Sequence, residues 1–249
     1  FSSLKGKKMK NNNLTTAIIN NKELILENTN ITTIGKGVYN NSSTAIFTMN
    51  GGSITSNSFG VENYVAGSSF TMNNGTILST AAETIVNRVG TTMTINDGTI
   101  TSNTHAALWQ SGQCCNYNTV INVNGGTITG YNQGIYSNYF TILNISGGEV
   151  SNTHTTISAD NSVIYSYQYV RVNITGGKIY SPNSYGIYNP YGEVYYNIQN
   201  AVIDTYADGL NIRYNSLVID NTEITVRGDY SGIWDGRENV TVTNTTIKS

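Results

Sequence analysis

The chain repeats one short pattern of apolar and polar positions: apolar, polar, apolar, an Asn-like corner with Gly or Asn, and soon afterwards an Ile or Val. In its first three positions the pattern alternates with a period of two, so Phe47 and Met49 point to one side of a strand and Thr48 points to the other. The corner residues tolerate positive φ, which lets the chain turn sharply into a second strand. Each copy therefore predicts two short strands joined by a tight corner.

Ten copies of this pattern occur along the chain. The clearest copies cover residues 47–54, 70–77, 93–100 and 121–128, and weaker copies end at Ile31, Val150, Ile179, Ile203, Ile224 and Ile247. Successive end points are 23, 23, 23, 28, 22, 29, 24, 21 and 23 residues apart. Such spacing is typical of a solenoid, in which each repeat buries its apolar side chains against its neighbours.

A third strand is predicted in most repeats by a Gly followed by an aliphatic residue. These pairs are Gly37-Val38, Gly60-Val61, Gly134-Ile135, Gly186-Ile187, Gly209-Leu210 and Gly232-Ile233. Three short strands in about 23 residues fit a parallel β-helix better than a leucine-rich repeat or a propeller blade of about 40 residues. We therefore expect an all-β, single-stranded right-handed parallel β-helix of ten coils over residues 23–249, preceded by an N-terminal leader or cap over residues 1–22.

Two sets of segments resemble a known family. The segments 51–54 (GGSI), 125–128 (GGTI) and 176–179 (GGKI) look like the Gly-Gly-Ala-Ile repeats of chlamydial polymorphic outer-membrane proteins, and the segments 47–50 and 70–73 match their Phe-x-x-Asn element. More broadly, the chain resembles the pectate-lyase-like superfamily of right-handed β-helices, especially bacterial adhesins and secreted passenger domains. This resemblance implies a non-catalytic, adhesin-like or structural module that is secreted or on the cell surface. Its partners would be a glycan or a surface protein of a host or neighbouring cell.

Charge excludes some classes of partner. Charged residues make up 11% of the chain, its formal net charge is −2, and four lysines are crowded at Lys5, Lys7, Lys8 and Lys10. There is no basic stripe to follow a nucleic-acid backbone, and no apolar run approaches the roughly 18 residues that span a bilayer. We expect neither nucleic-acid binding nor membrane insertion.

The corner asparagines raise the question of metal binding. Asn50, Asn73, Asn96 and Asn124 recur at one corner, and we interpret them as stacked amides that form hydrogen bonds along the solenoid. The calcium-binding pattern Gly-Gly-x-Gly-x-Asp is absent. We therefore expect no metal and no cofactor.

Catalysis is an alternative, because many β-helices cleave polysaccharides with clustered carboxylates. The Gly-His-Gly and Asp-Asp signatures of a polygalacturonase-like enzyme are missing, and His105 and His154 are expected to be solvated turn residues. The C-terminal region is rich in Asp, Glu and Arg, at Asp204, Asp208, Asp220, Glu223, Asp229, Asp235, Glu238, Arg213, Arg227 and Arg237. We favour a solvated face there and assign no catalytic residue, with a polysaccharide lyase or hydrolase as the alternative.

Ice binding is a second alternative. The segments 53–55, 99–101 and 127–129 place paired hydroxyls on one face, but the segments 76–78, 149–151 and 178–180 interrupt the array.

Two adjacent cysteines, Cys114 and Cys115, fall in the 28-residue repeat, which we expect to form an exposed loop. Successive Cα atoms are about 3.8 Å apart, below the usual disulfide range, so a vicinal bridge would be strained. In an oxidising extracellular setting we favour this bridge over free thiols or intermolecular links.

Aromatic residues supply the candidate binding surface. Tyr39, Trp109, Tyr136, Tyr188 and Trp234 each follow an inward aliphatic residue of a third strand, so they should point outward on one face. We predict that Trp109, Tyr136, Tyr188 and Trp234 form a platform for sugar rings or a protein partner. The competing interpretation is that stacked rings only stabilise neighbouring coils.

The last residues, 246–249, lie just inside a second strand, with no capping helix. Because an uncovered coil exposes strand edges, we expect either a longer protein or self-association through an open C-terminal coil.

Overall fold

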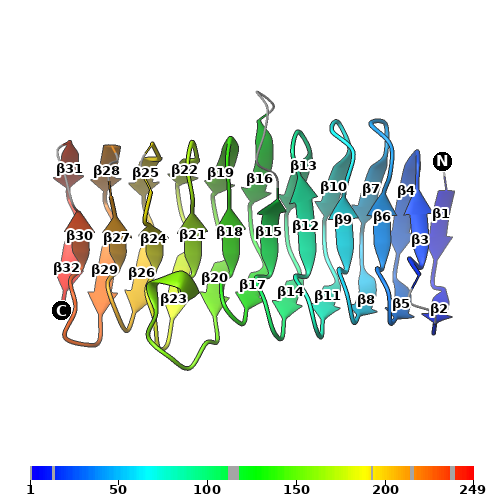
Figure 1. Cartoon of the computed structure of the whole chain (residues 1–249), viewed down its shortest axis with the longest axis horizontal. Helices are drawn as coiled ribbons and strands as arrows, with labels where there is room; N and C mark the ends of the chain where they lie inside the picture. The colour runs from blue at the N-terminus through cyan, green and yellow to red at the C-terminus, as the bar shows by residue number, and fades with distance from the viewer. Residues whose placement is uncertain (1, 13–14, 112–117, 192, 214–215, 236–238) are drawn as a thin grey trace.

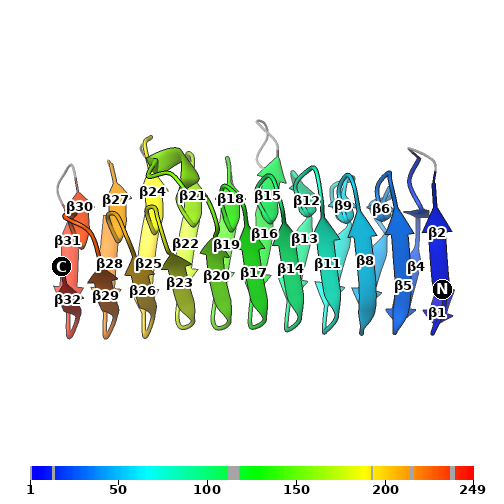
Figure 2. The ribbon, with the colours of Figure 1, turned by 90° about the horizontal axis from the view of Figure 1, so that it is seen from below.

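The computed structural model describes residues 2–12, 15–111, 118–191, 193–213, 216–235 and 239–249. In these residues the chain winds through stacked coils, each of which gives one strand to each of three parallel sheets (Figure 1). The sheets contain 11, 11 and 10 described strands and form the three sides of a rod (Figures 1 and 2). A parallel β-solenoid with three strands per coil, as the sequence predicts, is confirmed.

The three sheets are named here in the order in which each coil visits them. Sheet A contains β1 (Ser2–Lys5), β4 (Glu23–Glu27), β7 (Ile46–Met49), β10 (Ser69–Met72), β13 (Thr92–Ile95), β16 (Thr119–Val123), β19 (Thr141–Ile145), β22 (Arg171–Ile174), β25 (Tyr195–Gln199), β28 (Ser216–Asp220) and β31 (Val240–Thr243). Sheet B contains β2 (Lys8–Asn11), β5 (Thr29–Thr33), β8 (Gly52–Ser56), β11 (Thr76–Ser79), β14 (Thr99–Ser102), β17 (Thr127–Gly130), β20 (Glu149–Asn152), β23 (Lys178–Ser181), β26 (Val202–Thr205), β29 (Glu223–Val226) and β32 (Thr246–Lys248). Sheet C contains β3 (Ile18–Asn20), β6 (Val38–Asn40), β9 (Val61–Asn63), β12 (Ile85–Arg88), β15 (Leu108–Ser111), β18 (Ile135–Ser137), β21 (Ile164–Ser166), β24 (Ile187–Asn189), β27 (Leu210–Ile212) and β30 (Ile233–Asp235).

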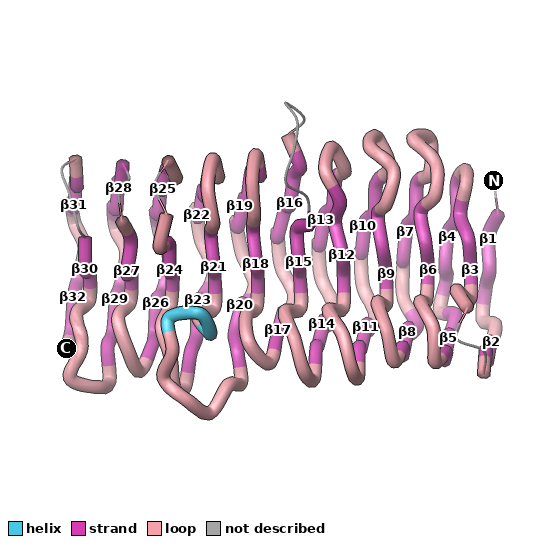
Figure 3. The backbone as a smooth tube through the Cα atoms, viewed as in Figure 1, coloured by secondary structure: helices cyan, strands magenta, loops and turns pink. Residues whose placement is uncertain are grey.

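The register of the strands follows the sequence repeat. In sheet B, Ile77 pairs with Ile54 on one side and with Ile100 on the other. The ten predicted end points form one continuous column, buried except for its last member: Ile31, Ile54, Ile77, Ile100, Ile128, Val150, Ile179, Ile203, Ile224 and Ile247. The 29-residue repeat keeps this register because its extra residues lie in a loop between β20 and β21. This loop contains the 3₁₀ helix η1 (Ala159–Asn161) (Figure 3).

The N-terminal segment, for which we expected a leader or cap, continues the winding. Its strands β1, β2 and β3 pair with β4, β5 and β6 and add one strand to each sheet. At the other end of the rod, the side chains of β31 and β32 are exposed. No helix in the described part of the chain is long and apolar enough to cross a membrane.

The core is built from columns of like side chains. Phe47 and Phe70, in successive coils, stack with ring centroids 4.8 Å apart, and both are fully buried. Burial of each such side chain stabilises the fold by about 1.5–3 kcal/mol, relative to leaving it exposed. Because each coil packs only on its neighbours, this stabilisation accumulates along the stack.

Glycines are required where coils approach closely. A Cβ added at Gly37, which precedes β6, would lie 2.4 Å from the carbonyl oxygen of Gly60 in the next coil. This contact explains why a Gly precedes the aliphatic residue of so many third strands.

The corner between sheets A and B carries the predicted amide ladder. Asn73 Nδ2 donates to Asn50 Oδ1 (2.8 Å), Asn96 to Asn73 (2.7 Å) and Asn124 to Asn96 (2.8 Å). The interpretation of these residues as stacked amides that form hydrogen bonds along the solenoid is confirmed.

A second amide ladder, which the sequence analysis missed, is buried at the corner between sheets C and A. Asn20 Nδ2 donates to Asn40 Oδ1 (2.8 Å), Asn40 to Asn63 (2.7 Å) and Asn63 to Asn87 (2.8 Å). Asn63 Nδ2 also donates to the carbonyl oxygen of Thr92 (3.2 Å). The signal in the sequence is an Asn two residues after the aliphatic residue of the third strand.

We expect Asn63→Ala to lower the free energy of unfolding by about 3 kcal/mol, because it leaves buried amide and carbonyl groups without partners. The control Asn73→Ala removes a residue of the exposed ladder and should cost less than about 1 kcal/mol. Denaturant unfolding of both variants checks this. Equal losses of unfolding free energy in the two variants would show that the buried ladder stabilises the fold no more than the exposed ladder does.

Candidate functional site

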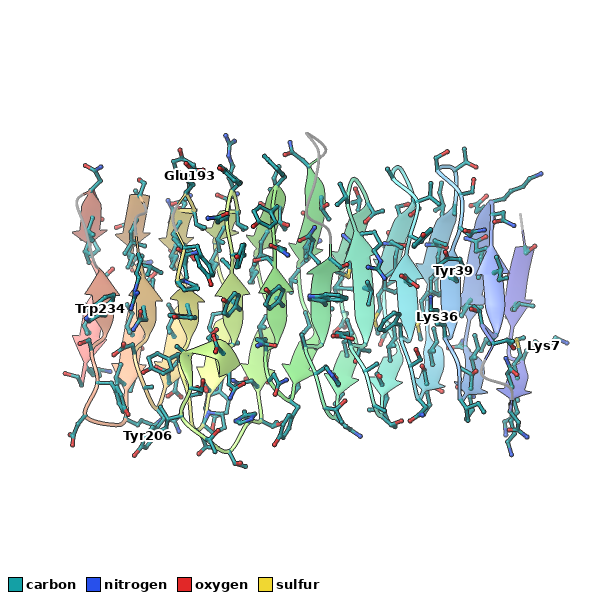
Figure 4. The ribbon with its side chains drawn as sticks, in the orientation of Figure 1. Lys7, Lys36, Tyr39, Glu193, Tyr206 and Trp234 are labelled. Atoms are coloured by element: carbon teal, nitrogen blue, oxygen red, sulfur yellow. The ribbon has the colours of Figure 1, made fainter. Side chains whose placement is uncertain are left out.

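The outward side chains of sheet C form one column. The register aligns Tyr39, Glu62, Val86, Trp109, Tyr136, Tyr165, Tyr188, Asn211 and Trp234. The structure thus brings the predicted aromatic residues onto one face, which Tyr39 and Trp234 mark near its two ends in Figure 4. Tyr165 belongs to the same row and was missed, because Val163 rather than Gly precedes its inward Ile164.

In the middle of this column the rings cover one another. Tyr136 and Tyr165 stack with centroids 4.8 Å apart and planes 9° from parallel, and the edge-on contact of Tyr165 with Tyr188 is 5.6 Å. Tyr165 is only 8% exposed. These tyrosines therefore stabilise neighbouring coils through their faces and present mainly ring edges to solvent.

The two tryptophans of the column have arginine neighbours. The guanidinium carbon of Arg88 lies 5.8 Å from the ring centroid of Trp109, and that of Arg213 lies 5.4 Å from the ring of Trp234. Trp234 is 40% exposed, so it is the most accessible of the four predicted platform residues. Cation–π contacts of this kind orient the rings.

A buried carboxylate lies toward the N-terminal end of the same face. Glu62 is fully buried, and it forms ion pairs with Lys36 and with Arg88, whose Nη2 lies 2.8 Å from Glu62 Oε1. Lys36 also lies over the ring of Tyr39. The two cations compensate the charge that burial would otherwise make costly.

A cavity of about 490 Å³ lies at the corner where the chain passes from sheet C to sheet A. We call it the corner groove. It is lined by Asn118, Phe140, Thr141, Ile142, Tyr169, Arg171, Glu193 and Tyr195. Glu193 marks this corner at the upper edge of Figure 4.

The lining of the corner groove comes from equivalent positions in successive coils. Ile142, Arg171 and Tyr195 pair with one another along sheet A. Two residues before these positions are Phe140, Tyr169 and Glu193, respectively. They form a parallel row along the corner. The groove therefore runs along the axis of the rod.

Two rings of the groove are open to solvent. Tyr169 is 46% exposed and Tyr195 is 60% exposed. Phe140 supports Tyr169 from the preceding coil, with ring centroids 5.2 Å apart and planes 5° from parallel. Behind them, Tyr167 contacts Tyr139 (5.1 Å) and Tyr191 (4.3 Å) and continues the aromatic surface.

The backbone under these side chains has a conformation that L-residues rarely adopt. The φ angles are 54° at Phe140, 56° at Tyr169 and 68° at Glu193. Two earlier coils have Gly67 (φ 91°) and Gly90 (φ 72°) at the equivalent position. A left-handed conformation costs a non-glycine residue about 1–2 kcal/mol, and such residues cluster at functional sites. The large side chains are thus kept at this corner against a backbone preference for Gly.

A row of amides lies on the same face of sheet A as the lining residues Ile142 and Arg171, two residues further along each strand. Asn122 Nδ2 donates to Thr94 Oγ1 (3.2 Å), Asn144 to Asn122 Oδ1 (2.9 Å) and Asn173 to Asn144 Oδ1 (2.9 Å). All three asparagines are half-buried. Each amide has two N–H donors and two acceptor lone pairs, so these contacts leave part of its capacity for a ligand.

The C-terminal acidic residues do not converge within the described part of the chain. Asp204 of β26 lies beside Thr225 of β29 and pairs with Arg227 (3.0 Å), which follows β29. Three other carboxylates have separate partners: Asp208 accepts from Asn211 and Ser231, Asp220 from Thr243 and Asn244, and Glu223 pairs with Lys248. The side chain of Asp235, together with Arg237 and Glu238, lies outside the described residues.

The remaining candidate residues have local roles. His105 is exposed and bonds with Thr104, whereas His154 is half-buried and contacts Tyr131 (ring centroids 4.8 Å apart) and Asn161. Where the structure describes side chains, no group of three or more His, Cys, Asp and Glu is placed to hold a metal ion. Cys114 and Cys115 lie outside the described residues.

The hydroxyl face of sheet B is interrupted as the sequence indicates. Thr99 and Thr101 pair with Thr127 and Thr129, but Leu78 and Glu149 occupy the same two columns in the flanking coils.

No protein-family model, curated protein or solved structure matches the chain. The class of the protein therefore rests on its structure, which is a parallel β-solenoid with an aromatic groove along one corner.

The strain at Tyr169 can be measured with a matched pair of variants. Ala normally stabilises a structured position more than Gly does, by about 0.5–1 kcal/mol. At φ 56° we expect the reverse, with Tyr169→Gly more stable than Tyr169→Ala by about 1 kcal/mol. Thermal or denaturant unfolding checks the order, and a more stable Ala variant would refute the strain.

Alkaline pH should destabilise the protein. Burial raises the pKa values of Tyr136, Tyr165, Tyr185, Tyr188 and Tyr196 above their ordinary value of 10.0. The unfolded chain therefore loses these protons first, so stability is retained below a pH of about 10 and falls as the pH rises above it. Tyrosinate absorbance and denaturant midpoints measured together check this. Ionisation of all tyrosines near pH 10 in a folded protein would contradict it.

Proposed function

We propose that the chain is a non-catalytic binding module, adhesin-like or structural, which acts outside the cell, on a surface or in secreted form. It binds a glycan or a surface protein through its aromatic side. The observation that carries this proposal is the corner groove, where the rings of Phe140 and Tyr169 are held at strained backbone positions in successive coils, next to the exposed ring of Tyr195. Strain of this kind is retained where side-chain placement matters for function.

The scaffold suits such a role. Continuous parallel sheets fix each groove residue relative to its neighbours, and the stack of Phe140 on Tyr169 holds one exposed ring in place before a ligand arrives. A preorganised surface binds more tightly because less side-chain entropy is lost on association. The resemblance of the Gly-Gly-x-Ile segments to bacterial surface proteins supports the extracellular location.

The outward column of sheet C extends the same surface. Trp109 and Trp234 offer partly exposed rings with a nearby arginine, and Tyr136 and Tyr188 offer ring edges. We propose that these four residues form the platform beside the groove. Rings with a polar edge or a neighbouring cation suit contact with sugars or with a protein.

Polysaccharide cleavage is a weaker proposal. Cleavage by hydrolysis requires two carboxyl groups that flank one bond, about 5–10 Å apart and free to exchange protons. Four of the C-terminal carboxylates, Asp204, Asp208, Asp220 and Glu223, are instead engaged in separate ion pairs and hydrogen bonds, which supports a non-catalytic role.

Binding of the protein to a glycan array, a cell-surface protein array and whole cells tests the proposal. We expect Tyr169→Gly with Tyr195→Ser to weaken attachment by about tenfold or more. Tyr136→Ser with Tyr188→Ser should weaken it less, because these rings are covered by their neighbours. Thermal stability is measured alongside, so that lost binding can be separated from lost fold.

The matched control is Tyr206→Ser. Tyr206 is 37% exposed at the opposite corner, between sheets B and C (Figure 4). Attachment should be unchanged in this variant. Attachment that survives all the aromatic-side substitutions in folded protein would overturn the proposal.

A further inference from the structure

We infer that the corner groove binds an extended, uncharged glycan that lies parallel to the axis of the rod, with sugar rings against Tyr169 and Tyr195 and hydroxyl groups on the amide row of sheet A. This inference rests on the proposed binding function and names the ligand class of that same site.

The direction of the ligand follows from the repeat. The lining residues Asn118, Phe140, Tyr169 and Glu193 occupy equivalent positions in four successive coils. Neighbouring parallel strands are about 4.8 Å apart, so the lining extends about 14 Å along the axis. A ligand that contacts all four coils must therefore be elongated along the rod.

The backbone around the groove disfavours an extended peptide. Peptides often bind by adding a strand to a free sheet edge. In sheet A, however, β19 pairs with both β16 and β22, and β22 pairs with both β19 and β25. These strands have no open edge at the groove, so recognition must come from side chains.

The side chains match a hydroxyl-rich ligand with apolar ring faces. Tyr169 and Tyr195 offer exposed aromatic surface. The amides of Asn122, Asn144 and Asn173 repeat once per coil and can both donate and accept hydrogen bonds, as sugar hydroxyls also can. The aromatic row can therefore contact the apolar faces of sugar rings, and the amide row beside it can form hydrogen bonds with their hydroxyl groups.

The charges of the groove favour an uncharged chain. Arg171 and Glu193 both line it, from neighbouring coils, and no described ion pair includes either residue. A polyanion would meet the carboxylate of Glu193, and a polycation would meet the guanidinium of Arg171. Like-charge contacts of this kind discriminate against both.

The experiment is calorimetric titration of the intact protein with linear uncharged oligosaccharides, from disaccharide to hexasaccharide. The probes are β-1,4-linked glucose, β-1,4-linked N-acetylglucosamine and α-1,4-linked glucose, with acidic oligogalacturonate for comparison. We expect at least one uncharged series to bind, with an affinity that rises with length and levels off once the groove is filled.

Variants locate the site and its direction. Tyr169→Gly and Tyr195→Ser should each lower the affinity for a tetrasaccharide about tenfold, and the two losses should combine in the double variant. Tyr206→Ser should leave the affinity unchanged. Unfolding curves confirm that each variant is folded, and Gly suits the backbone at position 169.

Three results would overturn the inference: no uncharged series binds, affinity does not depend on length, or oligogalacturonate binds more tightly. Any of these is distinguishable from failure of the proposed function. If cell or protein attachment still depends on Tyr169 and Tyr195, the binding function stands and only the ligand class is wrong.

Discussion

In-register parallel stacking is the constraint on which the rest of the structure depends. Each residue of an interior strand lies beside its equivalents about 4.8 Å away in the coils before and after it. A position therefore tolerates a side chain that can contact a copy of itself, such as an amide, an aromatic ring or an aliphatic group. The ladder from Asn50 to Asn124 and the stacked pair of Phe47 and Phe70 both satisfy this condition. Like charges do not, which explains why charged residues are few and why Glu62 lies between Lys36 and Arg88 from different coils.

The same constraint explains what could be predicted from the sequence. A periodic inward Ile such as Ile54 or Ile77 reveals the strands and their register, since the repeat length equals one coil. The outward aromatic row of sheet C followed from alternation within the third strand. The buried ladder of Asn20, Asn40, Asn63 and Asn87 was missed, because composition alone makes Asn a corner residue and burial of an amide depends on a partner in the next coil.

The corner groove was beyond prediction for a geometric reason. Tyr169 and Tyr195 are 26 residues apart in the chain. They line the same groove because β22 and β25, in successive coils, pair so that Arg171 lies beside Tyr195. The sequence also gives no sign that Phe140 and Tyr169 have positive φ, which Gly or Asn would signal. The aromatic residues of sheet C and of the groove therefore differ. The tyrosines of sheet C cover one another's ring faces, whereas Tyr169 and Tyr195 in the groove keep exposed ring surface.

The left-handed corner also makes the proposed binding surface modular. The backbone there has the same handedness whether the residue is Gly67, Gly90, Phe140 or Tyr169, so the side chain can change without altering the winding of the chain. Exchange of a single glycine for an aromatic residue, at a cost of about 1–2 kcal/mol, would lengthen the groove by one coil. A lineage of such solenoids can thus move or extend its recognition surface along the rod by point mutation, while the core and the register stay fixed.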